Sequence, residues 1–110
     1  MKVFSIDQMT KGWFVGDFLP TALAVDGFEV GVKRYKSGDC ESIHFHKISI
    51  EVTVIIEGQV KMNGVTYNSG SIILIEPNEA TDFYALTDVI TVVVKCPSVP
   101  GDKYLGNNHA

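Results

Sequence analysis

The stretch HFHKISIE, residues 44–51, places two histidines two positions apart and a glutamate five positions after the second. Side chains alternate between the two faces of a β-strand, so His44 and His46 point to the same face. If residues 47–50 form a four-residue hairpin loop, Glu51 lies directly across from His46 on the next antiparallel strand. The spacing then brings two imidazoles and a carboxylate together. A loop one residue longer or shorter would turn Glu51 to the opposite face.

This set of side chains suits a divalent metal ion. Neutral imidazole and carboxylate are good ligands for Zn²⁺, Fe²⁺, Mn²⁺ and Ni²⁺, and the spacing does not choose among these metals. Three protein ligands also leave coordination positions open for a substrate, as in catalytic metal sites. We therefore expect His44, His46 and Glu51 to hold a divalent metal ion. The alternative is that the three side chains work without a metal.

Strand-like segments fill most of the chain around this stretch. Asn63-Gly64 lies between two such segments and is a strong hairpin signal, because both central residues of a type I′ turn need positive φ. No window has a helical period of useful length. We therefore expect an all-β fold, either a two-sheet sandwich or a small jelly-roll barrel. The segments are rich in Val, Ile, Thr, Phe or Tyr and bounded by turn-forming residues: 12–19, 28–35, 42–47, 51–57, 59–63, 65–67, 71–76, 81–86 and 89–95.

The histidine stretch also belongs to a longer pattern, G-x5-H-x-H-x4-E-x6-G. This pattern resembles the first motif of the cupin superfamily and matches it at every fixed position: Gly38, His44, His46, Glu51 and Gly58. The resemblance extends over residues 28–95, the expected barrel core. It implies a cupin-type double-stranded β-helix, a jelly-roll barrel, in a single domain over residues 1–110.

The second cupin motif, typically G-x5-P-x-G-x2-H-x3-N, is matched only in outline by residues 70–86. Where the motif supplies a histidine as a fourth metal ligand, this sequence has Thr81, followed by Asp82. The resemblance therefore implies three protein ligands. Asp82, Glu79 or Glu76 would replace the histidine if the register shifted slightly. Thr81 and Asp82 are also candidates for contact with a substrate.

Two further residues are candidates for binding a ligand. Continuing the alternation from Glu51 turns Thr53 inward, where it would orient a substrate. Arg34 is the only arginine in the chain and shares a strand face with apolar residues. Two interpretations of Arg34 stay open. Either it points into the barrel and binds a carboxylate or phosphate, or it turns to solvent at the end of its strand.

The charge balance and the chain's start limit the partners. The net charge is −4 with only nine Lys and Arg residues, which argues against nucleic acid because phosphate binding needs clustered cations. The start MKVFSIDQMTKG has no apolar core of a signal peptide, and no run reaches membrane-spanning length. We expect a cytoplasmic protein that binds neither nucleic acid nor a membrane. His109 is interpreted as a surface residue.

The outward-facing residues of segment 51–57 are apolar: Val52, Val54 and Ile56. Such a face must be covered by more strands or by another copy of the chain. Cupins often dimerise through such surfaces, so the resemblance implies a homodimer.

The fold alone does not supply the function. The first hypothesis is a metal-binding protein that binds or acts on a small carbohydrate or organic acid. The second is a metal-free sugar isomerase or epimerase, in which Glu51 orients a histidine that moves protons. The third is a non-catalytic module that binds a small ligand. The sequence does not decide whether the protein is an enzyme.

Overall fold

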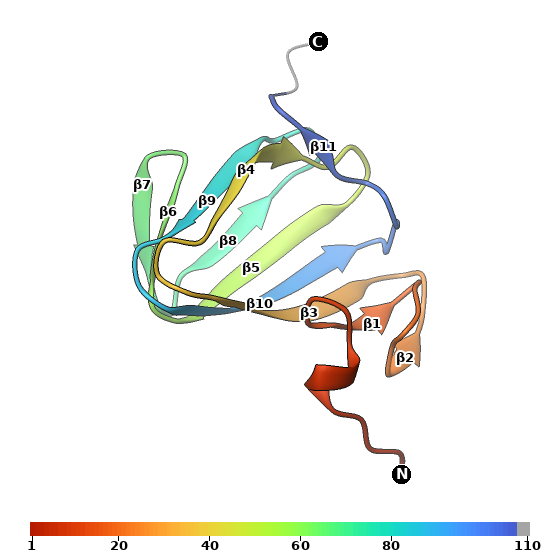
Figure 1. Cartoon of the computed structure of the whole chain (residues 1–110). Coiled ribbons are helices and arrows are strands. Elements are labelled where there is room, and N and C mark those ends of the chain that lie inside the picture. The colour runs from red at the N-terminus through yellow and green to blue at the C-terminus, as the bar shows by residue number, and fades with distance from the viewer. Residues whose placement is uncertain (108–110) are drawn as a thin grey trace.

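The computed structural model describes residues 1–107 and is built of two facing β-sheets (Figure 1). One sheet has six strands, in the order β2 (Leu23–Ala24), β1 (Trp13–Gly16), β3 (Glu29–Tyr35), β10 (Val89–Cys96), β5 (Ile50–Glu57) and β8 (Ile72–Ile75). The other has five, in the order β11 (Tyr104–Leu105), β4 (Cys40–Phe45), β9 (Thr81–Ala85), β6 (Gln59–Met62) and β7 (Val65–Asn68). A short 3₁₀ turn, η1 (Ile6–Gln8), precedes the first strand.

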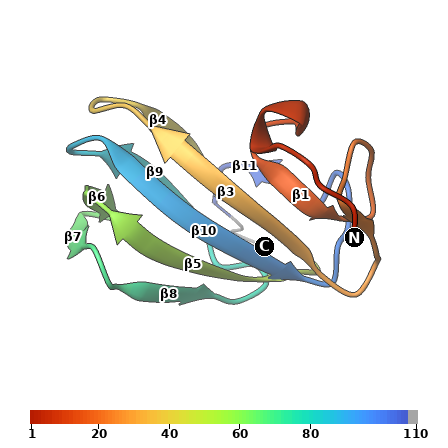
Figure 2. The same cartoon turned by 90° about the horizontal axis from the view of Figure 1, so that it is seen from below.

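Chain neighbours often lie in different sheets, which gives the jelly-roll arrangement (Figure 2). The chain crosses from β3 to β4, from β4 to β5, and from β9 to β10, each time changing sheet. The expected all-β, double-stranded β-helix fold is confirmed. Among the residues described, no helix is long and apolar enough to cross a membrane.

All nine predicted strands are present, with ends that differ by at most three residues from those expected. The two short strands β2 and β11 were not expected, because a pairing of two residues leaves no alternation to detect. The hairpin signal is confirmed: Asn63 and Gly64 have φ of 49° and 80° and join β6 to β7.

The hairpin expected at residues 47–50 is wrong. Strand β4 pairs with β9 and β11, whereas β5 pairs with β10 and β8, so β4 and β5 are not neighbours. The connection instead carries the chain from the five-stranded to the six-stranded sheet. As a result, His44 lies across from Thr81 on β9 and from Leu105 on β11.

The core lies between the two sheets. Gly58 allows the tight link from β5 to β6, since its φ is +95° and a Cβ would lie 2.2 Å from the backbone oxygen of Asp88. The buried core residues come from five strands: Ile55, Val60, Met62, Ile75, Phe83, Ala85 and Val89.

The outer face of β5 is apolar, as expected from the sequence, and the apolar surface continues onto β8. Ile56, Ile72 and Leu74 are 53%, 70% and 56% exposed. Register places Leu74 beside Val52 and Ile72 beside Val54, so these side chains form one surface. We call these five residues the outer patch. His109 lies outside the described residues.

Candidate functional site

The three predicted ligands line one cavity between the two sheets. The cavity has a volume of about 230 Å³, and Thr53 and Thr81 line it as well. His44 and His46 are 9% and 4% exposed. Because β4 and β5 lie in different sheets, the imidazoles and Glu51 meet across the interior of the fold. The three side chains line the same cavity, as predicted, but sheet packing rather than a hairpin brings them there.

Both histidines have one ring nitrogen occupied by a backbone carbonyl. His44 Nδ1 lies 2.9 Å from the Ser42 carbonyl oxygen, and His46 Nδ1 contacts the Asp102 carbonyl oxygen. A carbonyl only accepts hydrogen bonds, so each Nδ1 carries the proton. In a neutral imidazole, Nε2 then has a free lone pair. This is the arrangement in which proteins commonly orient metal-binding histidines.

Glu51 is held as a carboxylate next to His46. The distance from Glu51 Oε1 to His46 Nε2 is 3.5 Å, and Glu51 Oε2 accepts a hydrogen bond of 3.1 Å from the Thr53 hydroxyl. Burial alone would raise the pKa of Glu51, but His46, Lys95 and Thr53 together lower it. Thr53 therefore orients the carboxylate, a role that the sequence did not indicate.

The donor set fits a divalent cation in its chemistry. When His46 is neutral, its Nε2 lone pair faces the Glu51 carboxylate oxygen at 3.5 Å, and two acceptors at that separation need a proton or a cation between them. The His44 and His46 rings are 5.6 Å apart between centroids, in an edge arrangement. Within residues 1–107, however, no group of three His, Cys, Asp or Glu side chains is drawn together as a metal cluster.

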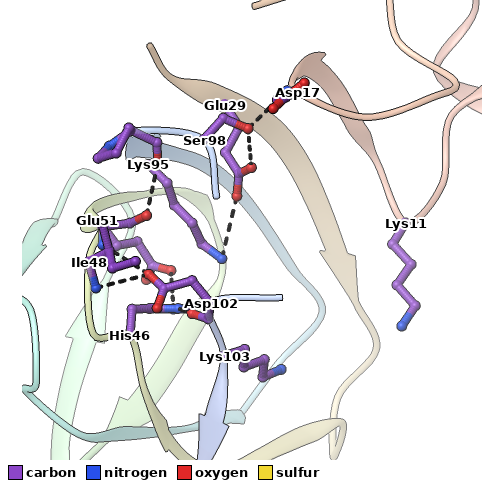
Figure 3. Close-up of polar contacts among 12 residues, drawn as sticks. Lys11, Asp17, Glu29, His46, Ile48, Glu51, Lys95, Ser98, Asp102 and Lys103 are labelled. Carbon is purple, nitrogen blue, oxygen red and sulfur yellow. Dashed lines mark hydrogen bonds and ion pairs between the residues drawn. The ribbon is translucent and has the colours of Figure 1, made fainter. Parts of the chain in front are cut away.

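The sequence reasoning missed Asp102, which lies in a segment with no regular pattern. Residues 97–103, which we call the C-terminal strap, leave β10 and cross to β11 in the other sheet (Figure 1). The side chain of Asp102 lies over the connection between β4 and β5 (Figure 3). It accepts hydrogen bonds from the backbone N–H groups of Lys47, Ile48 and Ser49 at 2.9, 3.1 and 2.9 Å.

The same residue also fixes His46 through its own carbonyl oxygen. Burial alone would raise the pKa of the Asp102 carboxyl, but the three backbone N–H groups and His46 hold it below its usual value. Asp102 is thus a positioning residue, which ties the strap to a predicted ligand. The only feature of the sequence that could have indicated this role is an aspartate shortly before a pair of strand-like residues.

Four predicted residues lie outside the cavity. Arg34 is exposed, so the interpretation in which it turns to solvent holds, and its neighbours Lys33 and Tyr35 line the cavity instead. Asp82 accepts a hydrogen bond from the backbone N–H of Asn63 and supports the hairpin there.

The two other acidic candidates are also placed elsewhere. Glu79 accepts a hydrogen bond from the backbone N–H of Glu76, and both are exposed outside the cavity. No carboxylate from this region therefore takes the place of the second-motif histidine. Thr81 occupies that place on the cavity wall.

Lysines also line the cavity, and no pattern in the sequence predicted this. Lys11, Lys33, Lys95 and Lys103 all contribute to its wall. Figure 3 shows Lys95 extending toward Glu29, and its ammonium lies 3.7 Å from that carboxylate. The lysines come from β3, β10, the strap and the turn before β1, so no single run of sequence reveals them.

Trp13 lies between two of these lysines. The Lys33 and Lys95 ammonium groups are 5.3 and 5.0 Å from the centre of its ring, within the range of cation–π attraction. The ring packs against Gly31, where an added Cβ would be only 2.7 Å from a ring carbon. Gly31 therefore permits the close approach of Trp13 that arranges both lysines.

Comparison with known proteins places the fold. No protein-family model matches the chain, and no curated protein matches its sequence. An uncharacterised conserved protein with a double-stranded β-helix domain from Klebsiella pneumoniae superposes with a TM-score of 0.71 at 19% identity, covering 97% of this chain and 93% of that one.

Two further solved structures match a smaller part of the chain. An RmlC-like cupin from Shewanella frigidimarina superposes with a TM-score of 0.63 at 18% identity. The match covers 68% of this chain and 70% of that one. A sugar phosphate isomerase from a cupin superfamily, from Silicibacter pomeroyi, superposes with a TM-score of 0.60 at 18% identity. The match covers 67% of this chain and 53% of that one. At the level of the fold, these matches agree with the resemblance seen in the first motif: the chain has a double-stranded β-helix fold similar to that of these structures.

Proposed function

We propose that the protein holds a divalent metal ion with His44, His46 and Glu51 and uses the adjoining cavity to bind or transform a small carbohydrate or organic acid. The observation that carries this proposal is the hydrogen bonding of the two imidazoles. Each Nδ1 is occupied by a backbone carbonyl, which leaves each Nε2 as a free donor atom at the cavity beside a carboxylate.

The residues around this donor set have separate tasks. Ser42 and Asp102 fix the two rings through their carbonyl oxygens, and Thr53 fixes Glu51 through its hydroxyl. A bound divalent ion would supply Lewis-acid polarisation of a ligand carbonyl or hydroxyl oxygen. The cavity walls limit the ligand to a small molecule, because about 230 Å³ is below the usual size of sites for drug-like ligands.

A second candidate function is metal-free proton transfer. The 3.5 Å contact between His46 Nε2 and Glu51 Oε1 supports it, because a protonated His46 would donate to the carboxylate and so carry a proton at the cavity. The likeness in fold to a sugar phosphate isomerase is consistent with such chemistry. In this alternative the protein acts as an isomerase or epimerase without metal. A third outcome, ligand binding without turnover, would identify a binding module.

We also propose that two copies associate through the outer patch. The five apolar side chains lie on two adjacent strands, and three of them are more than half exposed. Exposed apolar surfaces of this kind mark association sites in many proteins.

The metal proposal is tested by comparing two carboxylate variants on the same strand. Glu51→Gln removes the charged ligand, and Glu57→Gln is its control, since Glu57 is exposed at the end of β5. We expect Glu51→Gln to weaken Zn²⁺ or Mn²⁺ binding, measured by calorimetry, at least tenfold, while Glu57→Gln stays unchanged. Equal affinity in both variants would remove Glu51 from the ligand set. Turnover by metal-free protein on a keto-sugar would favour the second candidate.

A further inference from the structure

The cavity is cationic in a protein that is acidic overall. The chain has a net charge of −4, yet four of its eight lysines line this one cavity, against two carboxylates, Glu41 and Glu51. Two of the four lysines have carboxylate partners: Lys95 lies 3.7 Å from Glu29, and Lys103 lies 3.7 Å from Glu41. The remaining two, Lys11 and Lys33, form no ion pair among the described residues.

Lys33 is the informative member of this group. It is half-buried, and its ammonium donates a 2.7 Å hydrogen bond to the Lys11 carbonyl oxygen but contacts no carboxylate. Burial lowers the pKa of Lys33, and Glu41 only partly offsets this effect. A half-buried ammonium group without a carboxylate partner would be further stabilised by a bound anion.

The buried hydroxyl group of Thr91 lies directly beside Lys33 and points independently to a ligand. Thr91 is 1% exposed, lines the cavity, and its hydroxyl has no hydrogen-bond partner in the described part of the chain. Thr91 and Lys33 are register partners on β10 and β3, so their side chains project from the same face about 5 Å apart at Cβ. Buried hydroxyls nearly always have a partner, so a hydrogen bond from a ligand atom to the Thr91 hydroxyl would be favourable.

The position of this pair relative to the proposed metal ligands sets the size of the ligand. Lys95 is the register partner of Glu51, and Thr91 lies four residues before Lys95 on β10. Four strand residues span about 13 Å, and side chains from both ends reach into that interval. The space between suits a molecule of about the size of a hexose, in agreement with the cavity volume.

We propose that the cavity binds a small organic anion whose carboxylate or phosphate group lies between the Lys33 ammonium and the Thr91 hydroxyl. Trp13 borders the same anion site, and the rest of the ligand extends toward Lys95, His44, His46 and Glu51. This inference deepens the proposed function by naming its substrate class, and it rests on that function only in taking this cavity as the ligand site.

The experiment uses the chain's single tryptophan as the reporter. Trp13 contacts both Lys33 and Lys95, so its fluorescence should change when an anion binds beside them. The probes are glucose, glucuronate and glucose 6-phosphate, three hexoses that differ only at C6, together with inorganic phosphate. Titrations are run on metal-free full-length protein, so their result does not depend on whether the metal proposal holds.

We expect a saturable signal for at least one anionic probe and at least tenfold weaker binding of glucose. A preference for glucuronate identifies a carboxylate ligand, and a preference for glucose 6-phosphate or inorganic phosphate identifies a phosphate. Lys33→Gln should weaken the preferred anion about tenfold, whereas the control Lys61→Gln, on the exposed side of β6, should leave it within twofold.

Thr91→Val separates a ligand contact from a structural role. It removes the unpartnered hydroxyl with little change of shape, so the thermal stability should stay equal or rise while anion affinity falls severalfold. The proposal is overturned if glucose binds as well as the anionic probes, or if no anion changes the Trp13 signal up to about 10 mM. It is also overturned if Lys61→Gln weakens binding as much as Lys33→Gln.

Failure of this inference and failure of the proposed function are distinguishable. Metal content is measured in the absence of any sugar, and anion preference is measured in the absence of metal. If the protein selects anions but never binds a metal, the anion site is supported and the metal site is refuted.

Discussion

Replacing Asp102 with alanine should both destabilise the protein and leave the His46 ring less firmly oriented. In the folded chain, the Asp102 carboxylate accepts three backbone hydrogen bonds, from Lys47, Ile48 and Ser49, and the residue is 6% exposed. Removing the carboxylate leaves three N–H groups without their acceptor. At about 1 kcal/mol each, the expected loss of unfolding free energy is about 3 kcal/mol. For a chain of this size, that corresponds to a fall in Tm of roughly 12 °C.

The pH dependence gives this prediction a sharper form. The folded-state pKa of Asp102 is lowered, so its stabilisation is fully present above the unfolded pKa of about 3.9 and is lost as the pH falls through the lower folded value. The difference in unfolding free energy between parent and Asp102→Ala should therefore be constant near neutral pH and shrink below about pH 4. Asp102→Asn retains one acceptor oxygen and should lose less than the alanine variant.

The assay is urea unfolding followed by circular dichroism at several pH values, with Asp26→Ala as the control for removing an exposed aspartate. Metal affinity, measured on the same proteins, should fall about tenfold or more for Asp102→Ala, because strap residue 102 also orients His46. A parent-minus-variant difference that is the same at pH 7 and pH 3 would refute the role given to the carboxylate. So would an alanine variant as stable as the Asp26→Ala control.

Two further predictions concern packing. Gly31→Ala would place a methyl group against the Trp13 ring, where a Cβ would be 2.7 Å away. We therefore expect the free energy of unfolding to fall by about 1–3 kcal/mol and the tryptophan emission to shift. The comparison is Gly64→Ala, where nothing lies within 4 Å but φ is +80°, and which should lower stability without altering the emission. Ile72→Glu in the outer patch should convert the expected dimer to a monomer in light scattering while leaving the unfolding transition in place. A parent protein that is already monomeric would remove the dimer proposal.

The sequence carried enough information to predict the strands and the approximate site. Alternating apolar residues and regular turn signals locate nine strands, and the spacing of His44, His46 and Glu51 is confined to one motif. What it did not carry is which strands pair. Local spacing favours a hairpin between neighbours, whereas in the fold β4 and β5 pair with distant strands and their side chains meet through the interior.

The parts of the site that were missed share a physical cause. Lys33 and Trp13 meet only through long-range pairing, and Asp102 reaches the connection between β4 and β5 from an irregular strap with no periodicity to detect. Arg34 was placed on the face of its apolar neighbours correctly, but that face is the outer one. Alternation tells which residues share a face, and the topology decides which face is inside.

The metal site proposed at His44, His46 and Glu51 can be tested directly. The most direct measurement is elemental analysis of protein purified without chelator or affinity-tag metal, beside the His44→Ala/His46→Ala double variant. We predict near-stoichiometric divalent metal in the parent and none in the folded double variant. If neither protein binds metal, even after Zn²⁺, Mn²⁺, Fe²⁺ and Ni²⁺ have been offered, the metal site is refuted and these side chains serve proton transfer or direct ligand binding.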